Sequence, residues 1–239
     1  MALIEQEDIE TRSDFDVDLV EFAGSDELIC KAARVSTVGA ASIDTKESAG
    51  LIRFLMSNRH GTPFEHSLMM FRISAPIVVW REFMRHRIGI SYNEQSGRYM
   101  ELSPVFYVPT SARNLVQIGK PGHYRFVQGN VDQYDTCVDA LLESYIASWS
   151  SYQRQLDIGV AKEVARLCLP VSIYSTAYVT MNPRSLMNFL SLRTKNDDSL
   201  FPSYPMWEIN QVADQMEAIF ADKFPITHEA FNDARRVAP

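Results

Sequence analysis

The residues best suited to chemistry in this chain are arginines, and a dense group of them lies between Trp80 and Tyr99. The run Arg-His-Arg occupies 85–87, and the run Ser-Gly-Arg-Tyr at 96–99 follows after eight residues. Guanidinium forks and main-chain N–H groups bind anions, so the segment predicts an anion site, with phosphate the natural ligand. A solvated basic surface is the alternative, because charged side chains usually face water.

A helix followed by a polar loop is expected to position these groups. Apolar residues recur at helical spacing until Gly89, which should end the helix. On that helix Glu82, Arg85 and His86 share one face and can meet a single bound object. The serine, asparagine and glycine residues beyond it predict a loop.

Elsewhere, alternating apolar residues predict strands and helical periodicity predicts helices. The expected strands cover 13–22, 67–75, 105–108 and 171–181, and the expected helices cover 25–39, 44–57, 131–156, 158–169, 182–193 and 206–220. Residues 109–127 predict a long surface loop, 194–205 a polar connection, and the tail after Pro225 a short, partly exposed end. We therefore expect an α+β fold: a single domain, 1–239, with a small, mostly antiparallel sheet flanked by long helices.

Composition favours a globular intracellular protein. The chain has 239 residues, of which 46% are hydrophobic, so it can bury one sizeable core. A net charge of −7 does not support broad binding to nucleic acid or membranes. Three cysteines do not predict a disulfide framework, and the sequence shows neither a signal peptide nor an apolar run of ~20 residues. We expect cytoplasmic localisation, with no membrane or nucleic-acid partner.

Other chemistries have weaker support. His60, Glu65 and His66 suggest a metal hydrolase, but the tight helical spacing of a zinc protease is missing, so no metal is predicted. Glycine-rich dinucleotide and phosphate-loop motifs are absent. Cys168 lacks the surroundings of a thiol nucleophile, and Ser96 has no recognisable base beside it.

A nucleic-acid-binding module is the main alternative from another class. It would grip RNA or single-stranded DNA through cations interleaved with aromatic rings. The residues concerned are Arg85, Arg87, Arg98, Tyr92 and Tyr99.

Three motifs resemble those of the flavin-dependent thymidylate synthases. Arg-His-Arg followed after eight residues by Ser96 matches the longer form of the family signature. The segment His-Gly-Thr-Pro-Phe-Glu-His at 60–66 is similar to a flavin-site segment, and Asn-Pro-Arg-Ser-Leu-Met-Asn-Phe-Leu-Ser-Leu-Arg at 182–193 is similar to the second motif. The resemblance covers about Ser25 to Arg193.

The resemblance implies a reaction and its cofactors. NADPH would reduce bound FAD, 5,10-methylenetetrahydrofolate would supply a one-carbon unit, and dUMP would be methylated to dTMP. The family assembles as a homotetramer whose sites combine residues of several subunits. A virus-encoded copy would work in the host cytoplasm.

The resemblance also implies roles for individual residues. Those expected near dUMP are Glu82, Phe83, Met84, Arg85, Glu94, Gln95, Ser96, Gly97, Arg98, Arg166 and Arg193. Those expected near FAD are Ser36, His60, Thr62, Arg85, His86, Arg87, Glu94, Asn182, Pro183, Arg184 and Asn188. Without the resemblance, Ser36 would serve as a local backbone partner, and Glu163 with Arg166 would form a surface ion pair.

Arg193 is expected to be the catalytic residue. Uracil is easier to alkylate at C5 when its N3 proton is lost or its carbonyls are polarised. A fixed guanidinium aimed at that edge stabilises the developing negative charge. Arg98 and Arg166 would hold the 5′-phosphate and ribose, and so position the nucleotide.

Overall fold

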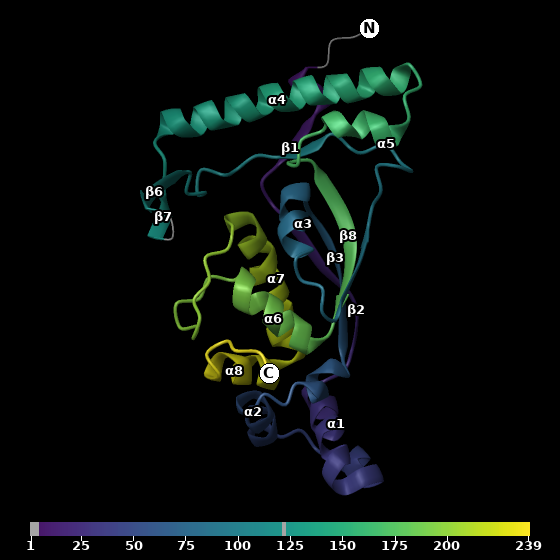
Figure 1. Ribbon diagram of the computed structural model, residues 1–239, viewed down its shortest axis with the longest axis vertical. Coiled ribbons are helices and arrows are strands. Elements are labelled where there is room, and N and C mark those ends of the chain that lie inside the picture. The colour runs from purple at the N-terminus through teal and green to yellow at the C-terminus, as the bar shows by residue number, and fades with distance from the viewer. Residues whose placement is uncertain (1–4, 121–122) are drawn as a thin grey trace. The chain divides into compact units, whose positions relative to one another are not determined.

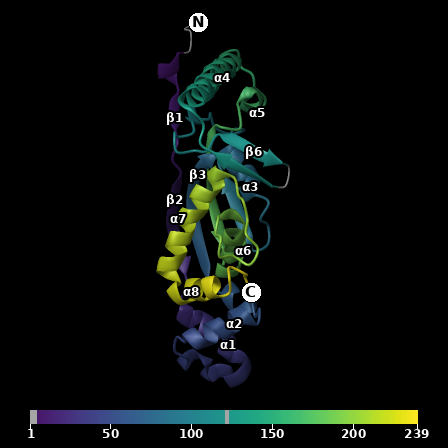
Figure 2. The ribbon, with the colours of Figure 1, turned by 90° about the vertical axis from the view of Figure 1, so that its left-hand side faces the viewer.

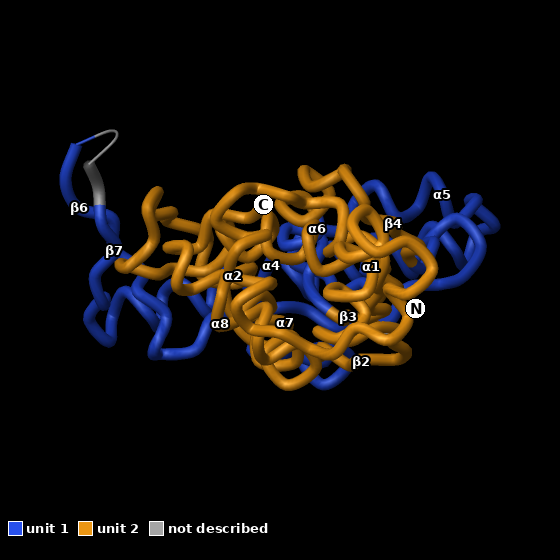
Figure 3. The backbone as a smooth tube through the Cα atoms, turned by 90° about the horizontal axis from the view of Figure 1, so that it is seen from below, with its two compact units in different colours: residues 1–14, 75–80, 95–175 blue, residues 15–74, 81–94, 176–239 orange. Residues whose placement is uncertain are grey.

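The computed structural model describes residues 5–120 and 123–239. Contacts divide the chain into two compact units, coloured separately in Figure 3. Unit 1 comprises residues 1–14, 75–80 and 95–175, and unit 2 comprises residues 15–74, 81–94 and 176–239. The fold is α+β, as predicted, and the assignment of one domain to 1–239 stays a prediction.

A small sheet forms the centre of unit 2. Its strand order is β2 (Asp16–Ala23), β3 (Leu68–Pro76), β8 (Tyr174–Met181) and β4 (Ile90–Glu94). The pairs β2–β3 and β4–β8 are antiparallel. Alternate residues of β3 are fully buried, as the sequence pattern predicts for a strand with one face on the core.

Helices accompany this sheet in unit 2, and three of them begin with a side-chain cap. The helices are α1 (Asp26–Val38), α2 (Ala49–Ser57), α6 (Pro183–Arg193), α7 (Trp207–Lys223) and α8 (Pro225–Asp233), with short 3₁₀ turns at Gly39–Asp44 and Thr62–Glu65. Ser25, Ser48 and Asn182 accept main-chain N–H groups at the starts of α1, α2 and α6. Helix α7 lies against β2 and α6, and α8 lies against α7 and α2 (Figures 1 and 2).

Unit 1 is built on one long helix, α4 (Val131–Asp157), against which α5 (Lys162–Ala165) and a 3₁₀ turn at Arg166–Cys168 pack (Figure 1). Its strands are β1 (Glu10–Arg12), parallel to β5 (Val105–Tyr107), and the hairpin of β6 (Val116–Lys120) and β7 (His123–Val127). A 3₁₀ turn at Gln6–Asp8 precedes β1. Aromatic side chains of α4 lie in the core of unit 1: Tyr145 stacks on Phe106 at 4.7 Å between ring centroids, and Trp149 and Tyr152 are buried beside them.

The helix expected to run to Gly89 is shorter. Helix α3 covers Ile77–Phe83, so Arg85 and His86 do not share a helical face with Glu82. Residues 90–94, expected to be a loop, form β4 instead. The Tyr92 hydroxyl donates to the main-chain oxygens of Phe83 and His86 at 3.0 and 2.6 Å, which closes the chain after the helix.

Other predicted boundaries were also wrong. Helix α2 starts after Ser48 and not at Asp44, which ends the preceding 3₁₀ turn. The expected 109–127 loop contains the hairpin β6–β7, apart from 121–122, which lie outside the described residues. The helix expected at 158–169 is reduced to α5 and its 3₁₀ turn.

The tail expected to be exposed is instead the helix α8. The main-chain N–H groups of Ile226 and Thr227, in the first turn of α8, donate hydrogen bonds to the buried carboxylate of Asp26 at 2.9 and 3.0 Å. This cap comes from a residue distant in sequence, so local patterns could not show it. None of the helices in the described ranges is long and apolar enough to span a bilayer.

Candidate active site

Arg193, the last residue of α6, is held by two residues of the 82–86 segment. Its Nη1 donates to the Glu82 carboxylate at 2.5 Å, and its Nη2 donates to the Glu82 main-chain oxygen at 3.2 Å. Its Nε–H donates to Nε2 of His86 at 2.9 Å. Glu82 and His86, expected to face one bound ligand from a shared helical face, instead both contact Arg193 of the protein itself.

The surroundings of His86 keep its imidazole neutral. Burial, and then the positive charge of Arg193, lower the pKa of His86 to about 4, although Glu82 opposes the shift. The ring lies edge-on to Phe189, with centroids 4.9 Å apart, and Phe189 stacks on Phe83 at 4.4 Å. Phe83, expected near dUMP, is therefore a fully buried packing residue.

Tyr92 is a supporting residue that the sequence did not single out for this role. Burial raises its pKa to about 12, so the phenol stays protonated and keeps donating to the two main-chain oxygens that it bridges. A tyrosine between two polar residues of a strand gave no local signal of this contact.

Arg184, expected near FAD, lies at the start of α6. Its Nη1 pairs with Glu65 at 2.5 Å, and its Nε donates to the main-chain oxygen of Pro239 at 2.6 Å. A Cβ on Gly61 would overlap the Arg184 guanidinium, so this glycine leaves room for the side chain. Asn188 donates to the Arg184 main-chain oxygen at 3.0 Å.

The N-terminus of α6 is capped by the side chain of Asn182. The Asn182 side chain accepts from Ser185 N at 2.8 Å, and the buried Pro183 occupies the first helical turn. Ser185 Oγ donates to the Ile88 main-chain oxygen at 2.9 Å, which ties the segment after Arg-His-Arg to the helix. Gly89 has φ +67° and passes so close to Ser185 that a side chain there would collide with it.

The remaining unit 2 candidates lie mostly at the surface. Arg85 and Arg87 are exposed and form no salt bridge in the part of the chain that the structure describes. Ser36 is exposed and donates to the Ala33 main-chain oxygen at 3.0 Å, the local role that its position suggests. Others at or near the surface are His60, Thr62, Met84 and Glu94, the last of which ends β4.

Unit 1 brings together the candidates for phosphate binding. Ser96 Oγ accepts from Arg98 N at 3.3 Å, and the Cβ position of the buried Gly97 lies 3.2 Å from Cδ of Arg166. Arg98 pairs with Glu163 at 2.8 Å and lies over the Tyr99 ring at 5.7 Å. The expected Glu163–Arg166 pair was wrong, because the helix becomes a 3₁₀ turn at Arg166 and Glu163 is bonded to Arg98. Gln95 precedes this group and is half-buried.

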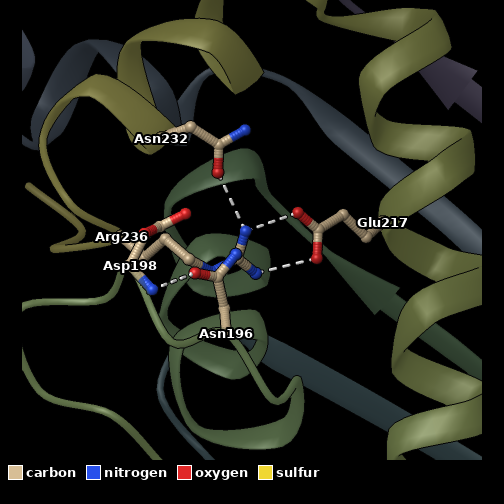
Figure 4. A pocket seen from close by; sticks show the side chains of 5 residues that line it. All are labelled: Asn196, Asp198, Glu217, Asn232 and Arg236. Atoms are coloured by element: carbon tan, nitrogen blue, oxygen red, sulfur yellow. Dashed lines mark hydrogen bonds and ion pairs between the residues drawn. The ribbon is translucent and has the colours of Figure 1, made fainter.

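Another arginine–glutamate pair in unit 2 lines a pocket (Figure 4). The pocket has a volume of about 220 Å³ and is lined by Asn196, Asp198, Glu217, Asn232 and Arg236. Arg236 binds both carboxylate oxygens of Glu217, at 2.6 and 2.7 Å, and donates to Thr194 Oγ1 at 2.6 Å. Sequence reasoning missed this pair, because Glu217 lies on α7 and Arg236 lies in the turn after α8.

The metal interpretation gains no support from the geometry. The described residues contain no group of three or more His, Cys, Asp or Glu side chains that could hold a metal ion. Glu65 is bonded to Arg184, and His60 lies edge-on to Phe54 with centroids 5.7 Å apart.

Comparisons with known proteins agree on one family. The family model described as thymidylate synthase complementing protein matches residues 18–226. The flavin-dependent thymidylate synthase of Streptomyces coelicolor is 52% identical over 236 residues, covering 97% of this chain and 96% of the relative. That of Tropheryma whipplei is 52% identical over 231 residues, covering 95% and 96%.

Solved structures give the same result. The UMP/dUMP methylase PolB from Streptomyces cacaoi, bound with 5-Br UMP, is 49% identical and superposes with a TM-score of 0.90 over 97% of this chain and 100% of that chain. Its complex with 5-Br dUMP gives a TM-score of 0.92 over the same shares. Together, these relatives and solved structures show that the chain is an enzyme of nucleotide modification. The chain belongs to the flavin-dependent thymidylate synthase family.

Proposed function

We propose that this enzyme methylates dUMP to dTMP, with 5,10-methylenetetrahydrofolate as one-carbon donor and NADPH as reductant of bound FAD. The observation that carries the proposal is Arg193, whose guanidinium is fixed by three hydrogen bonds and is 16% exposed. An arginine has five N–H donors, so one remains on each terminal nitrogen for a ligand. That pair of donors suits the polar edge of a pyrimidine.

Arg193 would act by electrostatic stabilisation. Its two remaining N–H groups would face the N3 and carbonyl edge of uracil, where negative charge develops as C5 attacks the one-carbon unit. Glu82 fixes the guanidinium in place and would line the nucleotide with Met84 and Arg85. In unit 1, Arg98, Arg166 and the 95–97 backbone would bind the phosphate and ribose.

The residues present fit a flavin dinucleotide. Exposed Arg85 and Arg87 suit an anionic diphosphate, and Arg184 with the start of α6 adds further donors. We assign FAD contacts to Ser36, His60, Thr62, Arg85, His86, Arg87, Glu94, Asn182, Pro183, Arg184 and Asn188. Bound reduced flavin would supply the hydride that completes the methyl group as tetrahydrofolate leaves.

Tritium release from [5-³H]dUMP tests the reaction directly. With FAD, NADPH and methylenetetrahydrofolate, the purified protein should release tritium and form dTMP, and omitting the folate should stop both. A colourless protein that binds single-stranded nucleic acid in a salt-dependent way, without tritium release, would favour the binding-module alternative.

UMP is a second candidate substrate, because the solved neighbour is named a UMP/dUMP methylase. The same assay with [5-³H]UMP decides this point. Equal specificity constants for the two nucleotides would show dual use, whereas release from dUMP alone would restrict the enzyme to the deoxyribonucleotide.

We also propose a homotetramer with sites shared between subunits, working in the cytoplasm. Apolar side chains exposed on unit 2 support an assembly, since such side chains gain from burial at an interface. They include Val35, Val38, Ile43 and Phe54, with exposures of 49–68%. Light scattering on the purified holoenzyme should give about four times the chain mass of 27.2 kDa; a monomer would contradict the assembly.

A further inference from the structure

The contact between Arg193 and His86 requires a specific protonation state of the imidazole. The Nε–H of a guanidinium always donates, so Nε2 of His86 must accept at the observed 2.9 Å. An imidazole nitrogen accepts only when it carries no proton, so the ring is neutral and its proton lies on Nδ1. The lowered pKa of His86 agrees with this state at neutral pH.

A neutral acceptor has a physical advantage at this position. Glu82 already places one carboxylate on Arg193, at 2.5 Å. A second carboxylate would weaken the ability of the guanidinium to stabilise an anion, whereas a neutral nitrogen orients it and leaves its charge in place. The groups bearing on the imidazole charge are Arg193 on α6 and Glu82 on α3.

The imidazole ring and the backbone of His86 are each held by a separate contact. Phe189, one turn before Arg193 on α6, lies edge-on to the ring. Tyr92 holds the main-chain oxygen of His86 from β4. The His86 imidazole therefore restrains rotation of the Arg193 guanidinium about its Cδ–Nε bond. The imidazole can do so because its own position is held by Phe189.

We propose that His86 is a positioning residue for Arg193: its Nε2 lone pair fixes the plane of the guanidinium and so aims the two remaining N–H groups at the pyrimidine. This inference rests on the proposed function and adds to the flavin contact assigned to the same residue. It predicts that the acceptor atom of His86 matters for turnover, beyond the volume of the ring.

Two substitutions at His86 distinguish the role of its acceptor nitrogen from the role of its aromatic ring. H86F keeps an aromatic ring against Phe189 but removes the acceptor, and H86Q removes the ring but keeps a neutral oxygen within reach of Nε of Arg193. In the holoenzyme, with flavin content checked by visible absorbance, H86F should lower kcat roughly 10- to 100-fold and change the KM for dUMP by less than about threefold. H86Q should retain kcat within about fivefold of wild type.

The opposite pattern would overturn the proposal. If H86Q loses as much kcat as H86F while both retain flavin, the ring and not its acceptor is needed. If both variants lose the flavin and regain full kcat at saturating FAD, the side chain serves the flavin alone.

A second measurement needs no catalysis. The chain has five histidines, so solid-state NMR of ¹⁵N-histidine-labelled holoenzyme, compared with H86Q, identifies the His86 signals. At pH 7 Nδ1 should be protonated and Nε2 unprotonated; a proton on Nε2 would exclude the proposed contact. Because this spectrum requires no dUMP turnover, it tests the contact even if the tritium assay disproves the proposed function.

Discussion

Two arginine–glutamate pairs in unit 2 have the same chemistry and opposite environments. Arg236 is 3% exposed and Glu217 18%, and their bonds to Thr194 and Asn232 use nearly all the polar groups internally. Arg193 is 16% exposed and Glu82 42%, and two guanidinium N–H groups remain for a ligand. From this difference we infer that the first pair stabilises the fold, and we propose that the second pair serves the substrate site.

Removing Arg193 should give the largest effect on activity. R193A is expected to lower dUMP turnover by about 1,000-fold or more, because the main stabiliser of the developing charge is lost, while flavin stays bound. Tritium release and the visible spectrum measure the two properties. The double variant R236M/E217M, which changes the other pair without leaving a buried charge unpaired, is the matched control, and normal turnover by R193A would show that the comparison assigns the roles wrongly.

Removing Arg236 should give the largest effect on stability. R236A leaves Glu217 largely buried without its main partner, so we expect a loss of about 3–5 kcal/mol in the free energy of unfolding, measured with urea. The double variant R236M/E217M should lose less, since no unpaired charge remains. If R236A and R193A lost equal free energies of unfolding, the two pairs would not differ in their contribution to stability.

A substitution at Gly61 tests a third arginine, Arg184, whose side chain is 40% exposed. G61A would push the Arg184 side chain away from Glu65 and Pro239, because the added Cβ overlaps the guanidinium. Loss of a charged hydrogen bond should weaken FAD affinity roughly tenfold or more. G50A is the control, since a Cβ there meets nothing within 4 Å, and it should leave the affinity unchanged.

Lowering the pH should reduce the free energy of unfolding through His86 and through Glu217 in different pH ranges, by smaller amounts than the substitutions above. The pKa of His86 is lowered from 6.5 to about 4, so the unfolded chain binds this proton first and stability falls as pH drops between those values. Allowing for solvent screening of a partly exposed ring, the loss should be about 1–2 kcal/mol, and H86Q should remove that part of the slope. Urea titrations at several pH values measure it, and an unchanged slope in H86Q would assign it to other groups.

The contribution of Glu217 to stability should change at a lower pH than that of His86. Burial favours a higher pKa, but hydrogen bonds from His228 and Arg236 outweigh it and lower the pKa to about 2 from 4.5. Its contribution is therefore complete above 4.5 and is lost as pH falls toward 2. Replacement by glutamine should flatten the stability curve in this lower range only.

Much of the local structure could be predicted because its causes are local. Ser25 and Asn182 cap the helices that the sequence pattern places after them, and β3 buries alternate residues as expected. The long helix α4 has its aromatic stripe on the core side. The motifs at 60–66, 85–99 and 182–193 were sufficient to predict the family that the comparisons then showed.

The tertiary structure decided which residues those motifs meet. Helix α3 ends at Phe83, so Glu82 and His86 approach Arg193 from a helix and from the turn after it. Glu163 binds Arg98, far away in sequence, in place of its neighbour Arg166. Sequence spacing describes neighbours on one element, whereas these contacts depend on where separate elements end and how they pack.

The sequence alone therefore determined the α+β class, the starts of helices such as α1 and α6, and the family, because propensity, caps and motifs act over a few residues. Only the tertiary structure decided that Arg236 is buried against Glu217 and that Arg193 is held by Glu82 and His86. The reason is that burial and hydrogen-bond partners are properties of packed elements, and no local pattern distinguishes one arginine from another.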